Sequence, residues 1–132
     1  MSVWSCRHFG VPAGAGTLRA SAGVIFHHSW TEAGVVAVPA VNGGQLLHLP
    51  VAMCVLNDSY REAKRLGIAL DNVAVEADGS FDNEWHSTGI QYSVTLHSCA
   101  SAEALVRLGA VVDQVAEIPR AIRAGAHVAR RA

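Results

Sequence analysis

The fold depends on one stretch of sequence, QLLHLPVAMCVLNDSYREAKRL, at residues 45–66. Apolar residues recur in it at steps of three and four, the spacing that places side chains on one face of an α-helix. They are Leu46, Leu49, Met53, Leu56, Tyr60 and Ala63. Because Val51, Cys54 and Val55 add apolar surface on other sides, the first half predicts a helix buried within its domain. Gly67 follows the stretch and is a suitable C-terminal cap.

Pro50 is the residue in this stretch that opposes a helix. Inside a helix, proline removes one backbone hydrogen bond and costs about 3 kcal/mol. We therefore expect either a kink at Pro50 or a helix that begins near Leu49.

The segments on both sides of this helix predict β-strands. Upstream, residues 24–30 alternate between two faces, and residues 35–38 form a second short run. Downstream, residues 73–78 and 90–97 alternate in the same way. The polar stretch between them, residues 79–89, predicts an exposed loop.

The two ends of the chain are less regular. Residues 10–16 are rich in glycine, alanine and proline and predict a loop, with residues 17–21 as a candidate strand. Ser101 is a suitable N-cap for a helix that extends to about Ala116, with Glu103 in its first turn. Residues 118–123 predict a short third helix, and residues 126–130 a last strand.

The length predicts one domain over residues 1–132, and the mixture of predicted helices and strands makes its fold class α+β. The chain is 51% hydrophobic and 16% charged, which is apolar for an isolated domain. We therefore expect a partner to cover part of its surface. The net charge of −1 does not favour nucleic acid or a membrane surface as a partner. The longest apolar run, residues 49–56, is too short to span a membrane.

Cys54 is the best candidate for chemistry. The chain contains three cysteines and no C-x-x-C pair, which favours a reducing compartment and hence a cytoplasmic location. A thiol between Met53 and Val55 is most simply a small apolar core residue. A reactive thiol needs a cationic or hydrogen-bonding neighbour. The helix itself offers none, because His48 lies on another face and about 9 Å along the axis.

Metal and cofactor motifs are not evident in the sequence. The seven histidines show no spacing typical of zinc ligands, and His27 and His28 point to opposite faces of a strand. The Gly14-Ala15-Gly16 segment lacks the third glycine of a dinucleotide-binding loop. We therefore expect no metal and no cofactor. The acidic residues of the polar loop, Asp78, Asp82 and Glu84, are expected to be solvated.

The order of the predicted elements resembles the OsmC/Ohr family, the osmotically induced and organic-hydroperoxide-resistance proteins. The local similarity begins at NGGQLL, residues 42–47, and continues through small and apolar residues to Cys54. It looks like the family's Asn-Pro-Glu-Glu/Gln-Leu segment, which leads to the reactive cysteine. The segment REAKRLGI, residues 61–68, looks like the family's helix end and is followed by a similar strand. The resemblance covers residues 16–132.

The resemblance implies an intertwined homodimer in which antiparallel sheets wrap around a long central helix. It places Cys54 at the position of the family's nucleophile. The resolving cysteine falls on Ala116, the glutamate that shapes the thiolate's environment falls on Gly44, and the corresponding arginine falls on Thr17. Arg19 lies two residues further on and is a candidate thiolate partner if this segment is a strand.

These departures leave three functional hypotheses. The first is a divergent OsmC-like homodimer that lacks two-cysteine hydroperoxide reductase activity and binds a small apolar ligand at its interface. The second is a one-cysteine peroxidase acting on organic hydroperoxides, with Cys54 recycled by an external thiol or by Cys99. The third is a structural, stress-associated dimer.

Overall fold

The structure is a computed structural model that describes residues 9–38 and 42–132. Its described part contains a five-stranded antiparallel sheet with the strand order β2-β3-β1-β4-β5. The strands are β1 (Val11–Ala15), β2 (Val24–Phe26), β3 (Val35–Ala37), β4 (Asn72–Phe81) and β5 (Ser87–His97). The helices are α1 (Gly43–Leu66), α2 (Ala102–Val115) and α3 (Glu117–Ala124), with a 3₁₀ turn, η2 (Gly16–Leu18). The predicted α+β class is confirmed.

The helix predicted at residues 45–66 is present as α1 and begins at Gly43. The Asn42 side chain caps its first turn by accepting a hydrogen bond from the backbone N–H of Gln45 at 2.9 Å. Gly67 ends it in the left-handed conformation, with φ of 72°. The alternative start near Leu49 is wrong, because α1 continues through Pro50. Packing of α1 against β1 and β4 supplies the stability that proline removes.

The predicted loop at residues 10–16 is wrong, because this segment forms the central strand β1. Its residues Val11, Ala13 and Ala15 are buried, and β1 pairs with both β3 and β4. The small side chains of this segment, which led to the prediction of a loop, allow α1 to pack closely onto the middle of the sheet. The segment after β1 is also not the candidate strand at residues 17–21, since it begins with the turn η2.

The strands β4 and β5 form a long hairpin whose two faces differ. Val73, Val75 and Ala77 of β4 are buried under α1, whereas Glu76 and Ser93 on the other face are exposed. Both strands extend into the predicted loop, so only residues 82–86 connect them. The register changes at Gly79, which accommodates the bend toward the hairpin tip.

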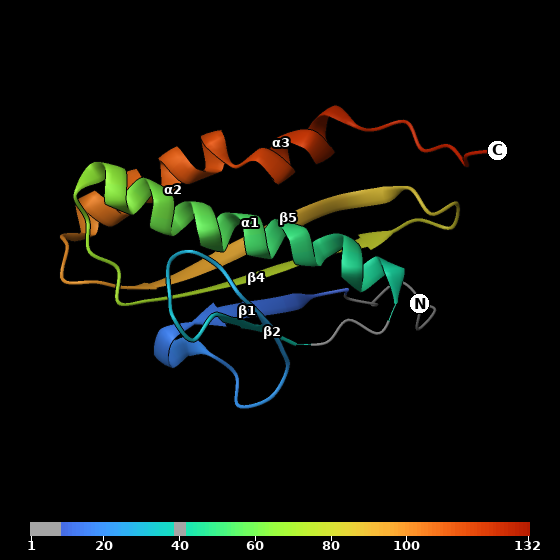
Figure 1. Ribbon diagram of the computed structural model, residues 1–132. Helices are drawn as coiled ribbons and strands as arrows, with labels where there is room; N and C mark the ends of the chain where they lie inside the picture. The colour runs from blue at the N-terminus through green and yellow to red at the C-terminus, as the bar shows by residue number, and fades with distance from the viewer. Residues whose placement is uncertain (1–8, 39–41) are drawn as a thin grey trace, which may run out of the picture.

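The three helices lie together on one side of the sheet (Figure 1). Helices α2 and α3 pack against α1, and the Tyr92 hydroxyl of β5 donates a hydrogen bond of 2.5 Å to Asp113 of α2. Ser101 caps α2 as predicted. The last strand predicted at residues 126–130 is wrong, because residues 125–132 are exposed and form no strand. Figure 1 shows this segment extending away from α3.

The predicted strand at residues 24–30 is shorter than expected, because β2 ends at Phe26. The following loop is attached to α1 through His28, whose Nδ1 lies 2.6 Å from Asn57 Oδ1. The other ring nitrogen of His28 lies 2.5 Å from Thr31 Oγ1. These polar contacts hold the connection to β3 against the helix and replace further sheet pairing.

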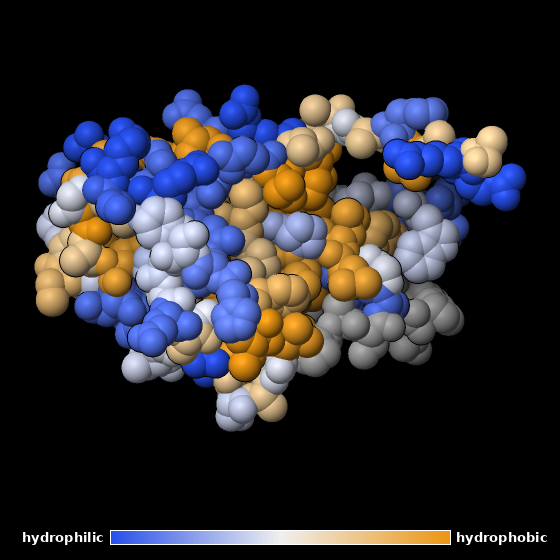
Figure 2. Space-filling view, viewed as in Figure 1, coloured by the Kyte–Doolittle hydropathy of each residue, from blue (hydrophilic) through white to orange (hydrophobic). Residues whose placement is uncertain are grey.

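Apolar side chains remain on the surface, as the composition indicates. Figure 2 shows apolar groups across the middle of one face, with hydrophilic groups around them. Exposed apolar residues include Val24, Ile25, Leu46, Leu47 and Val106. No helix among the described residues is long and apolar enough to cross a membrane.

Candidate functional site

Cys54 lies in a cluster of charged side chains where α1 meets the start of α3. Its Sγ is 3.5 Å from Asp58 Oδ2, one turn further along α1, and 3.8 Å from Glu117 Oε2 of α3. The Nη1 atom of Arg61 contacts both carboxylates, at 3.3 Å from Asp58 Oδ1 and 2.8 Å from Glu117 Oε1. We call these four residues the Cys54 cluster.

The electrostatics of the Cys54 cluster keep its thiol protonated. Burial raises the pKa of Cys54 above its usual value, and the negative charge of Asp58 raises it further. Backbone N–H groups of Ile118 and Glu117 act in the opposite direction without reversing the shift. A thiolate would add further negative charge, because the guanidinium of Arg61 already faces the carboxylates of Asp58, Glu62 and Glu117.

The two carboxylates of the cluster titrate together, with Asp58 as the better proton acceptor. Burial and a hydrogen bond with Glu117 raise the pKa of Asp58 to about 6. The same hydrogen bond, together with Arg61, lowers the pKa of Glu117 to about 2. Asp58 is 6% exposed, so its charged form loses hydration that the exposed Glu117 retains.

The Cys54 cluster contains atoms that a metal ion could bind. One ligand atom each from Cys54, Asp58 and Glu117 lie within 4.8 Å of one another. A thiolate and two carboxylates suit a divalent ion such as Zn²⁺. However, Arg61 already contacts both carboxylates, so its guanidinium takes the place of the cation in this arrangement.

Arg19, the candidate thiolate partner, lies in a different part of the fold. It follows η2, a turn held to the start of β4 by a 2.7 Å hydrogen bond from the Thr17 N–H to Asn72 Oδ1. Among the described residues, the side chains that hydrogen-bond to Cys54 Sγ are those of Asp58 and Glu117. A role for Arg19 beside Cys54 stays a prediction, and Arg61 is the arginine that the structure places in the cluster.

Cys99 lies beyond the far end of α1, away from Cys54. The neighbouring Ser98 donates a hydrogen bond of 2.5 Å to the carbonyl of Ala69, after the helix end. Cys54 precedes Leu66, the last residue of α1, by twelve residues, or about 18 Å of helix. Within one chain, Cys99 therefore does not meet Cys54.

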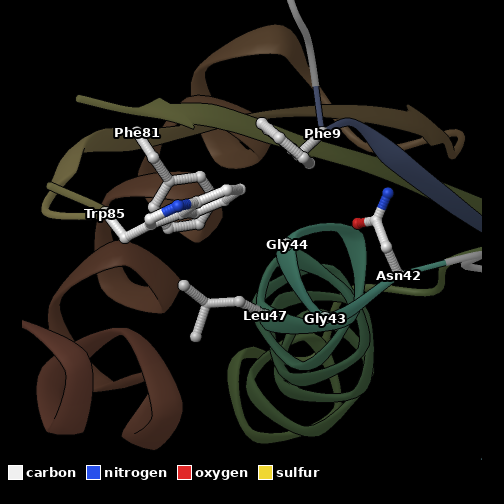
Figure 3. Close-up of a pocket in the computed structure, with 7 residues that line it drawn as sticks. All are labelled: Phe9, Asn42, Gly43, Gly44, Leu47, Phe81 and Trp85. Atoms are coloured by element: carbon white, nitrogen blue, oxygen red, sulfur yellow. The ribbon is translucent and has the colours of Figure 1, made fainter. Parts of the chain in front are cut away.

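A second candidate site lies at the N-terminal end of α1. A cavity of about 650 Å³ is lined mainly by apolar side chains and by the first residues of the helix. The lining residues are Phe9, Asn42, Gly43, Gly44, Leu47, Phe81 and Trp85. We call it the aromatic pocket. Figure 3 shows three aromatic rings beside the start of α1, and Leu47 projecting from the helix on the side of Trp85.

Gly44 and His48 of α1 lie against the aromatic rings of the pocket. A side chain at Gly44 would meet the Phe9 ring at 2.5 Å, so only glycine allows this ring to lie over the helix start. His48 is fully buried, and its Nδ1 bonds to the Gly44 carbonyl oxygen at 2.7 Å. Its ring contacts Phe9 and Phe81, with centroids 6.4 and 6.0 Å apart. The residue to which the family glutamate aligns thus belongs to a pocket wall.

The two sites share one face of α1. Leu47 of the pocket and Cys54 are seven residues apart, which is two helical turns and about 10 Å along the axis. Cys54 does not line the aromatic pocket. The prediction that the helix itself offers Cys54 no hydrogen-bonding neighbour is wrong, because Asp58 lies one turn further along α1. Their spacing of four residues could have indicated this contact in the sequence. No local pattern links Phe9, Phe81 and Trp85, which come together through the tertiary fold.

The two sites differ in what they can do. The Cys54 cluster offers thiol chemistry, and the aromatic pocket offers binding of an apolar molecule.

Comparisons of the chain with protein-family models, with curated proteins and with solved structures give no match.

Proposed function

We propose that this chain is a divergent OsmC-like protein that binds a small apolar ligand and acts as a homodimer. The aromatic pocket is the observation that carries this proposal. Its volume of about 650 Å³ suits a small molecule, since ligand pockets measure roughly 300–1,000 Å³. Its walls are mainly apolar, with the polar groups of Asn42 and the helix start at one end.

Exposed apolar groups in the pocket supply the driving force for binding. Leu47 is 37% exposed and Trp85 is 66% exposed. A ligand that covers their apolar surface gains about 25 cal/mol for each Å² removed from water. The polar sheet face around Glu76 and Ser93 offers no comparable surface, so the pocket is the favoured place for an apolar molecule.

The OsmC-like part of the proposal is supported by the position of α3. The resemblance aligns the family's resolving cysteine with Ala116, the residue just before α3. In the structure, the adjacent Glu117 lies against Cys54 at 3.8 Å. Glu117, which is 63 residues away from Cys54 in sequence, therefore approaches it in space, as formation of a disulfide bond would require of the resolving segment in a two-cysteine relative.

The ligand-binding hypothesis is favoured over a Cys54 peroxidase by the charges around the thiol. Attack on a peroxide requires the thiolate, and both burial and Asp58 raise the pKa of Cys54. The backbone N–H groups of Glu117 and Ile118 are the observation that favours peroxidase activity. Consumption of cumene hydroperoxide with dithiothreitol tests it, and activity that disappears in Cys54→Ser would establish the peroxidase.

Binding is tested with N-phenyl-1-naphthylamine, an uncharged probe whose fluorescence rises in apolar sites. We expect saturable binding that Leu47→Arg weakens at least about tenfold, because the substitution places a charge in the pocket. Val106→Arg is the matched control, since Val106 is 73% exposed on α2. It should change the affinity by less than about twofold. Absence of saturable binding, or equal affinity in Leu47→Arg, contradicts the proposal.

A further inference from the structure

Trp85 has an unusual backbone conformation at the tip of the β4–β5 hairpin. Among the residues that the structure describes, it is the one non-glycine residue with positive φ, at 63°. The left-handed region is unfavourable for a bulky side chain and persists only where the surroundings impose it. Trp85 is also 66% exposed, although tryptophan is one of the residues that gains most from burial.

Asp82 imposes this conformation on the turn. One carboxylate oxygen of Asp82 accepts hydrogen bonds of 2.9 Å from the backbone N–H groups of both Glu84 and His86. The backbone carbonyl of Asp82 accepts a third, of 3.1 Å, from the N–H of Trp85. His86 Nδ1 lies 3.1 Å from the second carboxylate oxygen. These bonds fix the backbone on both sides of Trp85. The hydrogen-bonded turn therefore holds the Trp85 indole at the pocket.

The three aromatic rings that line the pocket pack against one another at steep angles. Trp85 and Phe81 have centroids 5.3 Å apart at an angle of 45°, and Phe81 and Phe9 are 5.1 Å apart at 79°. Phe9 and Trp85 are 6.3 Å apart at 63°. None of these pairs is a parallel stack. The three rings therefore form a compact cluster packed edge to face, which lies beside the start of α1 in Figure 3 and lines the pocket.

We propose that the aromatic pocket selects a planar aromatic ligand and that Trp85 is the residue that determines this selectivity. The inference rests on the proposed ligand-binding function and adds the chemical class of the ligand. The negative faces and positive edges of the rings attract another ring beyond simple area burial. A saturated molecule of the same size buries similar area without that attraction. The expected preference for the aromatic compound is about threefold to tenfold.

The experiment compares 2-naphthalenemethanol with its fully saturated counterpart, decahydro-2-naphthalenemethanol, by isothermal titration calorimetry. We expect the aromatic alcohol to bind more tightly to the wild-type protein. Trp85→Leu keeps the position apolar and removes the ring, so the preference should fall to within about twofold. Trp85→Phe restores a ring and should recover part of it. The two alcohols also differ in shape, so the quantity to compare is the ratio of their affinities in the wild type and in each variant. An effect of shape that is the same in all proteins cancels in this comparison.

Asp82→Ala provides a readout outside the pocket lining. It removes the carboxylate that fixes the turn and leaves every pocket-lining residue unsubstituted. Because the turn then no longer holds the Trp85 indole at the pocket, the aromatic preference should also decline. If the wild type and Trp85→Leu prefer the aromatic alcohol to the same degree, the inference about Trp85 is overturned. If N-phenyl-1-naphthylamine still binds in that case, the proposed ligand-binding function stands. Failure of the probe and of both alcohols to bind overturns both. Circular dichroism of each variant verifies that the fold is retained.

Discussion

The thiol of Cys54 donates a hydrogen bond to the carboxylate of Asp58, with 3.5 Å between Sγ and Oδ2. The two residues are one helical turn apart on α1, so the helix itself fixes this contact. The carboxylate stabilises the protonated thiol and opposes its ionisation. This relationship distinguishes Cys54 from a cysteine activated by a neighbouring cation.

Replacement of Asp58 by asparagine should make Cys54 more reactive. The substitution removes the negative charge that raises the pKa of the thiol, so more thiolate is present at pH 8. We expect alkylation of Cys54 by iodoacetamide to be about threefold faster or more. Peptide mass spectrometry measures the rate at Cys54 and, as an internal control, at the exposed Cys99.

The pH profile of this reaction separates an electrostatic effect from a loosened fold. Loss of the charge should move the midpoint of the alkylation rate to lower pH. An increase by the same factor at every pH would instead show greater exposure of Cys54. A profile identical to that of the wild type would contradict the inhibitory role of Asp58.

Asp58 should also make the protein less stable as the pH rises. Its pKa is about 6 in the folded state and about 4 when unfolded, so the folded state binds more protons between these values. Stability from this group is present below pH 4 and is lost as the pH rises through 6. Asp58→Asn should therefore be more stable than the wild type at pH 7, on the order of 1 to 3 kcal/mol.

Urea unfolding between pH 4 and pH 8 measures this difference. The gap between the wild type and Asp58→Asn should grow over the range from pH 4 to pH 7. Ser21→Ala, at an exposed position without an ionisable side chain, is a control that should leave the pH dependence unchanged. A constant gap at all pH values would mean that Asp58 does not titrate as described. The lowered pKa of Glu117 adds the opposite dependence only below about pH 4.5.

The sequence predicts the helices well because their signals are local. The periodicity of α1, its end at Gly67 and the cap at Ser101 all depend on residues within a few positions. The strand β1 could not be predicted in this way. Its Gly14 and Pro12 favour a loop, and only pairing with β3 and β4 on both sides makes it a strand.

The candidate sites follow the same division. Cys54 and Asp58 share a helix face, so their contact could be predicted from their spacing. Glu117 approaches them because α3 folds back onto α1, and no sequence pattern indicates that contact. The aromatic pocket likewise depends on packing that brings Phe9 and Trp85 to the start of α1, with ring centroids 6.3 Å apart.

Gly44→Ala should damage the aromatic pocket, whereas Gly43→Ala should not. A Cβ atom at Gly44 would lie 2.5 Å from the Phe9 ring, about 1 Å closer than an ordinary contact, so the ring must shift. At Gly43, no atom lies within 4 Å of the added carbon. Both substitutions replace glycine by alanine at the start of the same helix, so effects of helix propensity are closely matched.

Titration with N-phenyl-1-naphthylamine distinguishes the two variants. Gly44→Ala should weaken binding about fivefold or more, and Gly43→Ala should remain within about twofold of the wild type. Thermal unfolding of both variants verifies that each remains folded. Equal affinities in the two variants would show that the Phe9 ring is not part of the binding site.

The edge strand β2 should contribute to the proposed homodimer. It lies at one end of the sheet with Val24 43% and Ile25 53% exposed. The opposite edge, β5, exposes Val94 at 37% and mainly polar residues such as Ser93 and Thr95. An exposed apolar edge strand favours association with another chain.

Ile25→Lys introduces a charge at this edge and should weaken dimerisation about tenfold or more. Sedimentation velocity over a range of protein concentrations measures the change. Val106→Lys is the matched control, because Val106 is also an exposed apolar residue but lies on α2. This substitution should leave the dimer intact. A wild type that sediments as a monomer at every concentration would contradict the dimer itself. A dimer that Ile25→Lys leaves unchanged would place the interface away from β2.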